Sequence, residues 1–384
     1  MYVFIHALCY FFALLIFTYF IYIVFHLLSW SRHPPVKIST GYAPKTRISI
    51  IIAARNEELT IGKCLASIAS QSYPAELLEI IVVDDHSTDK TIEVVKNIFL
   101  QMHIPGKCIS TREKAHGKKS ALTEGIKHSS GELLVITDAD CSSGKNWLVS
   151  IESEYKKTGA YMLCGPVEII SNKGIIGIFQ SLELCGLSLL SGAGIHAGVP
   201  LLCNGANLAY TRKVFDDVEG FKDIDNNPSG DDILLMFKIH HNYSGKIGYV
   251  KSTDAIVSTY AQDSIKAFLL QRIRWASKGL YSKNRVNSFV SLLVFASNFL
   301  SLAAILFSAI FEKIFPLIIP GIALKITADF LLLLFGTSFF RKKTLLWTFP
   351  ISEIITIAYV SWVGIAANFS SYSWKDRHYK RPLQ

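Results

Sequence analysis

The stretch LLVITDADCSS, residues 133–143, runs from a row of apolar residues straight into two aspartates, Asp138 and Asp140. In an extended strand, residues two apart point to the same side, so the pattern predicts that the two carboxylates lie close together. A divalent cation is a common reason for such a pair, because Mg²⁺ and Mn²⁺ prefer oxygen ligands. A solvated turn capped by an aspartate is the alternative that this pair alone leaves open.

Two earlier stretches follow the same plan: RISIIIAARNEE, residues 47–58, and EIIVVDDHSTDKT, residues 79–91. Each is a β-branched apolar run that ends in a polar turn and leads into a helical pattern, the second with Ser87 or Thr88 as the expected N-cap. The first of these helices is predicted to bury one face, formed by Ile61, Cys64, Leu65 and Ile68. Apolar strands that alternate with helices indicate an α/β fold with a mostly parallel sheet covered on both faces.

Polar side chains follow these strands, at the edge where open α/β sheets bind ligands. They are Arg55, Asn56, Glu57, Asp84, Asp85, Asp138 and Asp140. Neither G-x-G-x-x-G nor G-x-x-x-x-G-K-[ST] follows any of the strands, which disfavours a dinucleotide or P-loop site. We therefore expect a nucleotide recognised by carboxylates and held through a metal. Asp85 could accept from a base N–H and Lys118 could neutralise a phosphate, although a solvated lysine at a helix start remains an alternative for Lys118.

Hydropathy predicts an integral membrane protein. Half of the 384 residues are hydrophobic and only 18% are charged. A helix over residues 3–28 would be about 39 Å long, enough to span a bilayer, and the stretch lacks the basic start and the A-x-A site of a cleaved signal peptide. Further apolar segments cover residues 286–311, 314–340 and 344–370.

These segments give the predicted domain organisation. Residues 1–31 form an N-terminal transmembrane helix, 32–285 a polar domain of about 250 residues, 286–373 two to three membrane helices, and 374–384 a basic tail. Basic residues follow the first helix closely and none precede it, which places the polar domain in the cytoplasm, at the cell (inner) membrane. Those residues are Arg32, Lys37, Lys45 and Arg47.

The tail conflicts with that orientation if the chain has four full spans, because four spans would put its basic residues outside. Those residues are Lys375, Arg377, Lys380 and Arg381. Either the tail is an exception to the positive-inside rule, or one C-terminal segment is re-entrant, and the segment with Pro350 and Glu353 is the candidate. Lys325 and Asp329 are four residues apart in an apolar helix. They either belong to a functional site in the membrane or form an ion pair with each other that stabilises helix packing.

The cysteine spacing and the net charge indicate the state of the thiols and the class of binding partner. The seven cysteines have no C-x-x-C spacing and fit reduced thiols. The net charge is +9, with no basic run longer than three residues. This favours an anionic membrane surface or a phosphorylated substrate over nucleic acid.

Two segments of the polar domain are expected at the membrane interface. Residues 174–198, apolar and rich in glycine, lead to the sequence CNGAN, and residues 263–281 form an amphipathic helix that begins at Asp263. On this helix Gln271, Arg274 and Trp275 share one face. A helix that only rests at the headgroups is the alternative.

Seven motifs in order resemble the family-2 glycosyltransferases with the nucleotide-diphospho-sugar transferase (GT-A) fold, over residues 46–281. They are IIIAARNEE, IIVVDDHSTDKT, GKKSALTEGI, VITDADC, LLCNGANLAYTRKVFDDVEGF, SGDDILL and QRIRW. The layout is similar to membrane-bound members that resemble ceramide glucosyltransferases and polysaccharide synthases. The closing WKDRHY resembles the W-[KR]-G-R-x-Y tail of some lipid-directed members, with Asp376 in place of glycine.

The resemblance implies an inverting transfer in which an acceptor hydroxyl displaces a nucleoside diphosphate. It implies Asp232 as the catalytic base, with Asp231 as the second candidate for that role. The alternative is that the carboxylate only caps a helix. A divalent metal, Mg²⁺ or Mn²⁺, would be held by Asp140 and Asp138. Donor contacts are implied for Ala53, Arg55, Glu57, Asp85, Lys118, Asp138, Gln271, Arg274 and Trp275. Acceptor contacts are implied for Asn204, Gly205 and Trp275.

The sequence therefore predicts a membrane-embedded glycosyltransferase that moves a sugar from a UDP-sugar to a lipid hydroxyl at the cytoplasmic face. A processive polysaccharide synthase is the first alternative, and a catalytically silent membrane scaffold on the same fold is another. Product size separates the first two, and absence of any transfer identifies the third.

Overall fold

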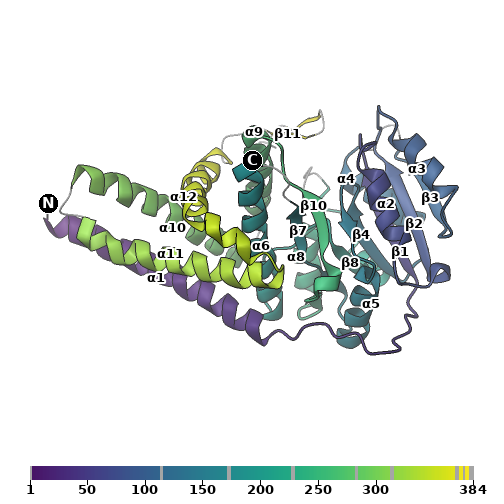
Figure 1. Cartoon of the computed structure of the whole chain (residues 1–384), viewed down its shortest axis with the longest axis horizontal. Coiled ribbons are helices and arrows are strands. Elements are labelled where there is room, and N and C mark those ends of the chain that lie inside the picture. The colour runs from purple at the N-terminus through teal and green to yellow at the C-terminus, as the bar shows by residue number, and fades with distance from the viewer. Residues whose placement is uncertain are drawn as a thin grey trace. The chain divides into compact units, whose positions relative to one another are not determined.

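The computed structural model describes residues 2–112, 116–170, 174–225, 230–281, 284–311, 315–367, 372–374 and 377–379. The chain divides into two compact units. One is an α/β unit formed by Arg32–Ser171 and Leu190–Ala261, and the other is a helical unit formed by Met1–Ser31, Asn172–Leu189 and Gln262–Gln384. Figure 1 follows the chain through both units, and each is described below by itself.

The α/β unit contains a seven-stranded sheet with the strand order β3-β2-β1-β4-β8-β6-β9. The first four strands in that order are parallel, and β8 runs antiparallel to both of its neighbours. The mostly parallel sheet predicted from the sequence is thus confirmed. Its strands are β1 Ile48–Ala54, β2 Leu78–Asp84, β3 Gly106–Ser110, β4 Leu133–Asp138, β6 Met162–Cys164, β8 Leu208–Thr211 and β9 Ile247–Tyr249.

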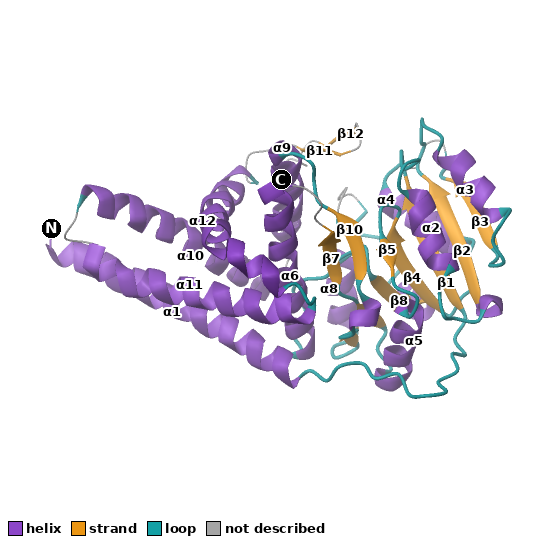
Figure 2. Ribbon diagram, in the orientation of Figure 1, coloured by secondary structure: helices purple, strands orange, loops and turns teal. Residues whose placement is uncertain are grey.

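Helices cover this sheet because its central strands are apolar on both faces. The helix α4, Lys118–Lys127, packs on β1 and β2. At Gly125 of α4 a Cβ would lie 2.6 Å from Ile51 and 2.9 Å from Val83, so glycine is what lets this helix approach the strands. Figure 2 labels four further helices of this unit, α2 Ile61–Ala69, α3 Thr91–Phe99, α5 Trp147–Thr158 and α8 Ile233–Asn242. The short helix α7, Arg212–Asp217, follows β8.

The structure confirms the predicted buried face of α2 but not the predicted N-cap of α3. The buried face of α2 consists of the four predicted residues, Ile61, Cys64, Leu65 and Ile68. The predicted N-caps Ser87 and Thr88 are wrong, because α3 begins only at Thr91, whose backbone N–H donates to the Asp89 carboxylate at 3.0 Å. A second small sheet, β5-β10-β7, joins Ser142–Ser143, Val257–Tyr260 and Val167–Ile170.

The helical unit is built from long apolar helices. Its elements include α1 Tyr2–Arg32, α9 Ile265–Tyr281, α10 Arg285–Ile310, α11 Phe315–Phe339 and α12 Phe349–Ala366. The amphipathic helix thus begins at Ile265, two residues after the predicted Asp263. Among the described residues, three candidate spans follow α9, at the upper end of the predicted two to three.

Five helices among the described residues are long and apolar enough to cross a membrane, which marks an integral membrane protein. The fifth is α6, Gly174–His196, in the segment expected to lie at the interface. On α1, one face packs inside the unit through Phe12, Ile16 and Tyr19, yet the opposite face is also apolar, with Phe11, Leu14 and Phe17 exposed. A helix that is apolar all round is typical of a membrane span. Of the predicted basic tail, Lys375, Lys380 and Arg381 lie outside the described residues.

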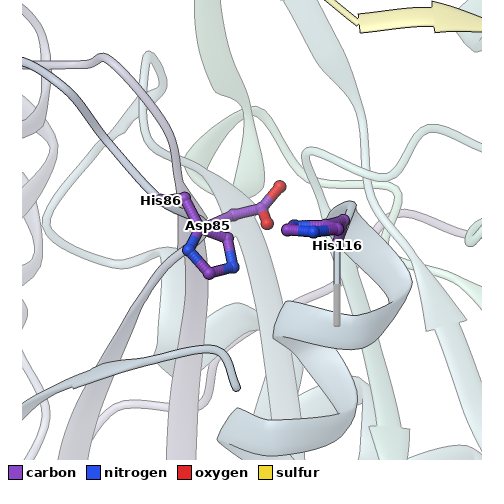
Figure 3. Close-up of side chains that lie close together, drawn as sticks. All are labelled: Asp85, His86 and His116. Carbon is purple, nitrogen blue, oxygen red and sulfur yellow. The ribbon is translucent and has the colours of Figure 1, made fainter. Parts of the chain in front are cut away.

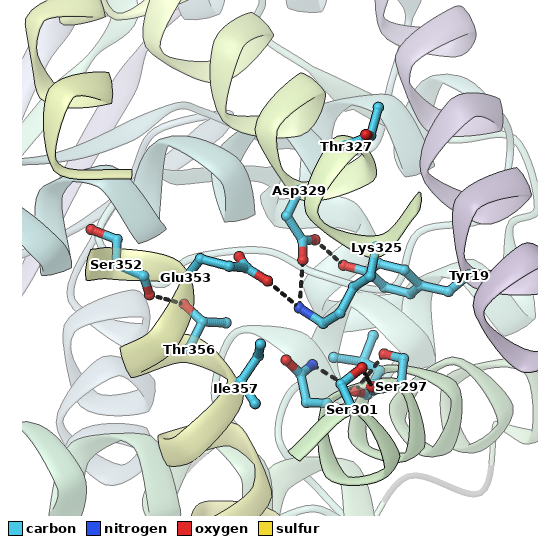
Figure 4. Close-up of polar contacts among 12 residues, drawn as sticks. Tyr19, Ser297, Ser301, Lys325, Thr327, Asp329, Ser352, Glu353, Thr356 and Ile357 are labelled. Atoms are coloured by element: carbon cyan, nitrogen blue, oxygen red, sulfur yellow. Dashed lines mark hydrogen bonds and ion pairs between the residues drawn. The ribbon is translucent and has the colours of Figure 1, made fainter. Parts of the chain in front are cut away.

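A buried ion cluster links three of these helices (Figure 4). Lys325 Nζ lies 2.7 Å from Asp329 on the same helix α11, and it also pairs with Glu353 of α12. The Tyr19 hydroxyl of α1 donates to Asp329. Lys325 is fully buried, so the predicted Lys325–Asp329 pair is present but is part of a larger network. The suspected segment with Glu353 is a continuous helix that supplies this network with a second carboxylate.

We predict that Lys325→Met destabilises the protein by about 3–5 kcal/mol, because it leaves two buried carboxylates without their cation. Thermal unfolding in detergent measures the loss. Combining Lys325→Met with Asp329→Asn and Glu353→Gln removes the unpaired charges and should recover most of the stability. Lys343→Met, at an exposed lysine, is the matched control. Equal stability of Lys325→Met and this control would show that the cluster does not hold the helices together.

Candidate functional site

Strand register places the predicted residues of β1, β2 and β4 at one edge of the sheet. Asp138 is the last residue of β4 and is paired in register with Ala53 of β1. Ala54 in turn is paired with Asp84, the last residue of β2. Asp85 follows directly and is buried. The carboxyl ends of β2 and β4, on either side of β1, therefore carry carboxylates at the same edge of the sheet.

Lys118, the first residue of α4, lies among these carboxylates. Its ammonium Nζ is 2.6 Å from Asp138 Oδ1 and 3.1 Å from Asp231 Oδ2, and its side chain is only 17% exposed. Burial alone would lower the pKa of Lys118, but the two aspartates outweigh it and hold that pKa well above its usual value. The alternative of a solvated lysine is thereby excluded.

The segment before α8 brings in the two predicted catalytic aspartates. Asp231 and Asp232 are both buried, and Asp232 is the N-cap of α8, where its carboxylate accepts from the Ile233 N–H at 2.7 Å. The other Asp232 oxygen accepts from the Gly205 N–H at 3.3 Å. A Cβ on Gly205 would lie 3.0 Å from Lys118 Nζ and 3.2 Å from Asp231 Oδ2, so a larger residue here would crowd the ion pair between them. Residues assigned to donor, acceptor and base thus lie together.

Asp138 and Asp140 supply the oxygen atoms of a candidate metal site. Ligand atoms of Asp138, Asp140 and Cys141 all lie within 4.8 Å of one another. The extended geometry assumed from the sequence is wrong, because β4 ends at Asp138 and Asp140 sits in a turn closed by Cys141 N–H donating to Asp138 O at 3.1 Å. The turn still brings the carboxylates together. Burial raises the pKa of the Cys141 thiol. Carboxylate oxygens are the ligands that Mg²⁺ and Mn²⁺ prefer, so Asp138 and Asp140 fit either ion.

Arg55 and Glu57 brace the loops that follow β1 and β2. The Arg55 guanidinium donates to the backbone oxygens of Asp85 and His86 at 2.8 and 3.1 Å. The Glu57 N–H donates to Thr91 Oγ1 at 2.8 Å, and its carboxylate accepts from Thr60 at 2.6 Å. These contacts fix the shape of the loops at this edge of the sheet. The Asp85 carboxylate accepts from the N–H of Gly117, the residue just before α4.

Asn56 joins the same two loops through its side chain. Its Oδ1 accepts from the Thr88 N–H at 2.8 Å, and its own N–H donates to Ser87 Oγ at 3.0 Å. Ser87 and Thr88, which the sequence predicted as caps of α3, therefore connect the loop after β2 to the loop after β1.

The sequence analysis missed Asn207, which holds the CNGAN loop. Its side chain accepts from the Trp147 indole at 3.0 Å and donates to the backbone oxygens of Pro166 and Ala255 at 2.9 and 2.8 Å. Asn204 acts within the loop, where its Oδ1 accepts from the Ala206 N–H at 3.0 Å. A buried asparagine with three partners fixes the loop that presents Gly205. Its place in a conspicuous polar motif was the available signal.

In the helical unit, the predicted face of α9 is organised by another missed residue, Arg272. Arg272 is buried and its guanidinium donates to Glu183 of α6, with Nε 3.0 Å from Oε2. It also donates to Gln271 and lies 4.2 Å from the ring centroid of Trp275. Two of the three predicted residues are thus positioned by Arg272, while Arg274 is half-buried on the same helix.

Two protein families match the chain. Residues 133–372 match the family described as glycosyl transferase family group 2, and residues 49–186 match glycosyl transferase family 2. The first match covers more than half of the chain.

Among curated relatives, the chain is 27% identical over 269 residues to a probable glycosyltransferase, YdaM, of Bacillus subtilis, covering 67% of this chain and 60% of that protein. It is 29% identical over 289 residues to a dolichyl N-acetyl-alpha-D-glucosaminyl phosphate 3-beta-D-2,3-diacetamido-2,3-dideoxy-beta-D-glucuronosyltransferase of Methanococcus voltae, covering 73% of this chain and 88% of that one. It is also 29% identical over 236 residues to a poly-beta-1,6-N-acetyl-D-glucosamine synthase of Staphylococcus epidermidis, covering 60% of this chain and 54% of that one.

Among solved structures, the chain is similar to the mannosyltransferase PcManGT from Pyrobaculum calidifontis in complex with GDP-Man and Mn²⁺. The TM-score is 0.59 at 18% identity, and the match covers 94% of this chain and 99% of that one. This similarity confirms the predicted GT-A fold.

The Lys118 geometry generates a prediction about metal binding. A metal ion held at Asp138 would compete with Lys118 for that carboxylate, so Lys118→Gln should strengthen Mn²⁺ binding by the nucleotide-free protein. We expect about a three- to tenfold gain, since a part-exposed ion pair is worth about 1 kcal/mol. Electron paramagnetic resonance of free Mn²⁺ measures the affinity, and Lys127→Gln at the exposed end of the same helix is the control. Weaker binding in Lys118→Gln would contradict the competition.

Proposed function

Because the chain belongs to the family-2 glycosyltransferases, we propose that it transfers a sugar from a UDP-sugar to the hydroxyl of a membrane lipid, with inversion at the anomeric carbon. The observation that carries the proposal is the cluster of Lys118, Asp138 and Asp231 at the carboxyl edge of the sheet. This edge is where nucleotides bind in open α/β sheets.

The donor lies, in this proposal, across the ends of β1, β2 and β4. Asp85 accepts from the base, and the diphosphate lies near Asp138, Asp140 and Lys118. Asp138 and Asp140 would hold a divalent metal, which would stabilise the charge that develops on the leaving diphosphate. The solved structure of the same fold that holds GDP-Man and Mn²⁺ supports a metal here.

The acceptor oxygen forms a bond to the anomeric carbon while the bond from that carbon to the diphosphate oxygen breaks. The hydroxyl proton passes to the Asp232 carboxylate. Two backbone N–H groups orient this carboxylate. Asp231 forms an ion pair with Lys118 and, in this proposal, positions the Lys118 ammonium.

A lipid acceptor is supported by the membrane helices. A lipid hydroxyl lies in the headgroup plane, and withdrawing the lipid would expose its tails at about 0.8 kcal/mol per CH₂ group. The name of the relative from Methanococcus voltae contains dolichyl N-acetyl-alpha-D-glucosaminyl phosphate, a lipid that carries a sugar. In this proposal the residues Gln271, Arg274 and Trp275 contact donor and acceptor, and the α/β unit lies on the cytoplasmic side of the cell membrane.

A polysaccharide synthase is the second candidate, supported by the relative from Staphylococcus epidermidis. In that case the same edge of the sheet would act on the end of a growing chain.

We predict that Asp232→Asn lowers turnover by about 10²- to 10⁴-fold, the usual effect of removing a general base, while donor binding is retained. Initial rates and calorimetric binding of the donor separate the two effects. Asp216→Asn, at an exposed aspartate of α7, is the control. An inactive Asp231→Asn together with an active Asp232→Asn would reverse the two roles.

The product test decides between the acceptors. Purified full-length protein, given radiolabelled UDP-sugars, Mn²⁺ and extracted membrane lipids, should place label in organic-soluble lipids that carry one or a few sugars. Asp140→Asn and excess chelator should both abolish the label. Label found solely in high-molecular-weight aqueous material would replace the lipid proposal with the polymer synthase, and no label with any donor would support the silent scaffold.

A further inference from the structure

A second group of metal-ligating side chains lies at the same edge of the sheet, outside the Asp138–Asp140 pair. It consists of Asp85 and His86, which follow β2, and His116, which precedes α4 (Figure 3). One ligand atom from each residue lies within 4.8 Å of the other two, and the two imidazole centroids are 4.6 Å apart. Residues thirty positions apart in the chain therefore converge on one point.

The surrounding structure holds this group in place. His86 has a φ of 60°, a backbone conformation that costs a residue other than glycine about 1–3 kcal/mol and persists only where its surroundings impose it. Arg55 donates to the backbone oxygens of Asp85 and His86 and so helps to hold this conformation. The Gly117 N–H, next to His116, donates to the Asp85 carboxylate and links the two ends of the cluster.

The chemistry of this group differs from that of the aspartate pair. Two imidazoles and one carboxylate are ligands typical of Zn²⁺ and other first-row transition ions, whereas Mg²⁺ requires oxygen. Around Zn²⁺ each ligand atom lies at about 2.0–2.2 Å, so the side chains would move inward by roughly an ångström. Asp85 is buried, His86 is half-buried and His116 is exposed, which lets an ion enter from solvent.

We propose that Asp85, His86 and His116 form an inhibitory site for Zn²⁺ or a similar transition ion. An ion bound there occupies the Asp85 carboxylate and so excludes the nucleotide base from it. This exclusion rests on the proposed role of Asp85 in donor binding, whereas the metal site itself does not.

Binding is tested first, without donor or acceptor. Tag-free full-length protein in detergent is titrated calorimetrically with Zn²⁺ in excess Mg²⁺, which occupies the aspartate pair. His116→Ala and His86→Asn should each weaken Zn²⁺ binding by about tenfold or more, given that residues merely supporting a ligand are worth 10- to 100-fold. Asparagine is chosen at His86 because it tolerates a positive φ.

Two matched variants guard the interpretation. His128→Ala removes an exposed histidine at the end of α4 and should bind Zn²⁺ as the native protein does. Cys141→Ser tests the thiol beside Asp138 and Asp140, and should also leave Zn²⁺ binding unchanged. Native-like binding by both His116→Ala and His86→Asn, or loss of binding in Cys141→Ser alone, would overturn the site.

The exclusion is tested second, by titrating UDP with and without saturating Zn²⁺. Zn²⁺ should weaken UDP binding by the native protein and leave it unchanged in His116→Ala. Equal UDP affinity with and without bound Zn²⁺ would overturn the inhibitory part of the proposal. If UDP does not bind even without Zn²⁺, the proposed donor site fails, while the first titration still decides the metal site.

Discussion

The Lys118 ammonium, held between the carboxylates of Asp138 and Asp231, is the interaction on which the candidate site depends. It joins the start of α4, the end of β4 and the segment before α8. Three aspartates gather around it, because Asp232 lies beside Gly205 and Gly205 beside Lys118. Like charges this close need a cation. Lys118 provides that cation. A bound metal would add positive charge beside the aspartates, and the nucleotide diphosphate would add negative charge.

Local pattern predicted the parts of the structure that depend on local physics. Apolar runs that end in aspartates predicted β2 and β4, and the 3.6-residue period predicted the buried face of α2. The long uncharged segments predicted membrane helices, since length and hydropathy are properties of a segment by itself.

What the sequence did not predict depends on partners distant in the chain. The spacing of Lys325 and Asp329 indicated a pair, but Glu353 comes from another helix and no periodicity connects it to them. Arg272 and Asn207 are polar residues whose partners are brought to them by the fold. The N-caps were misjudged because Ser87 is bonded to Asn56 of the neighbouring loop, which competes with helix capping.

The most direct measurement of the central claim is a crystal structure of the protein with UDP and Mn²⁺, with the metal located by anomalous scattering. The account predicts an anomalous peak at Asp140 and Asp138, the diphosphate beside that peak, and the uracil at Asp85. Mn²⁺ or UDP bound away from the carboxyl ends of β1, β2 and β4 would contradict the account.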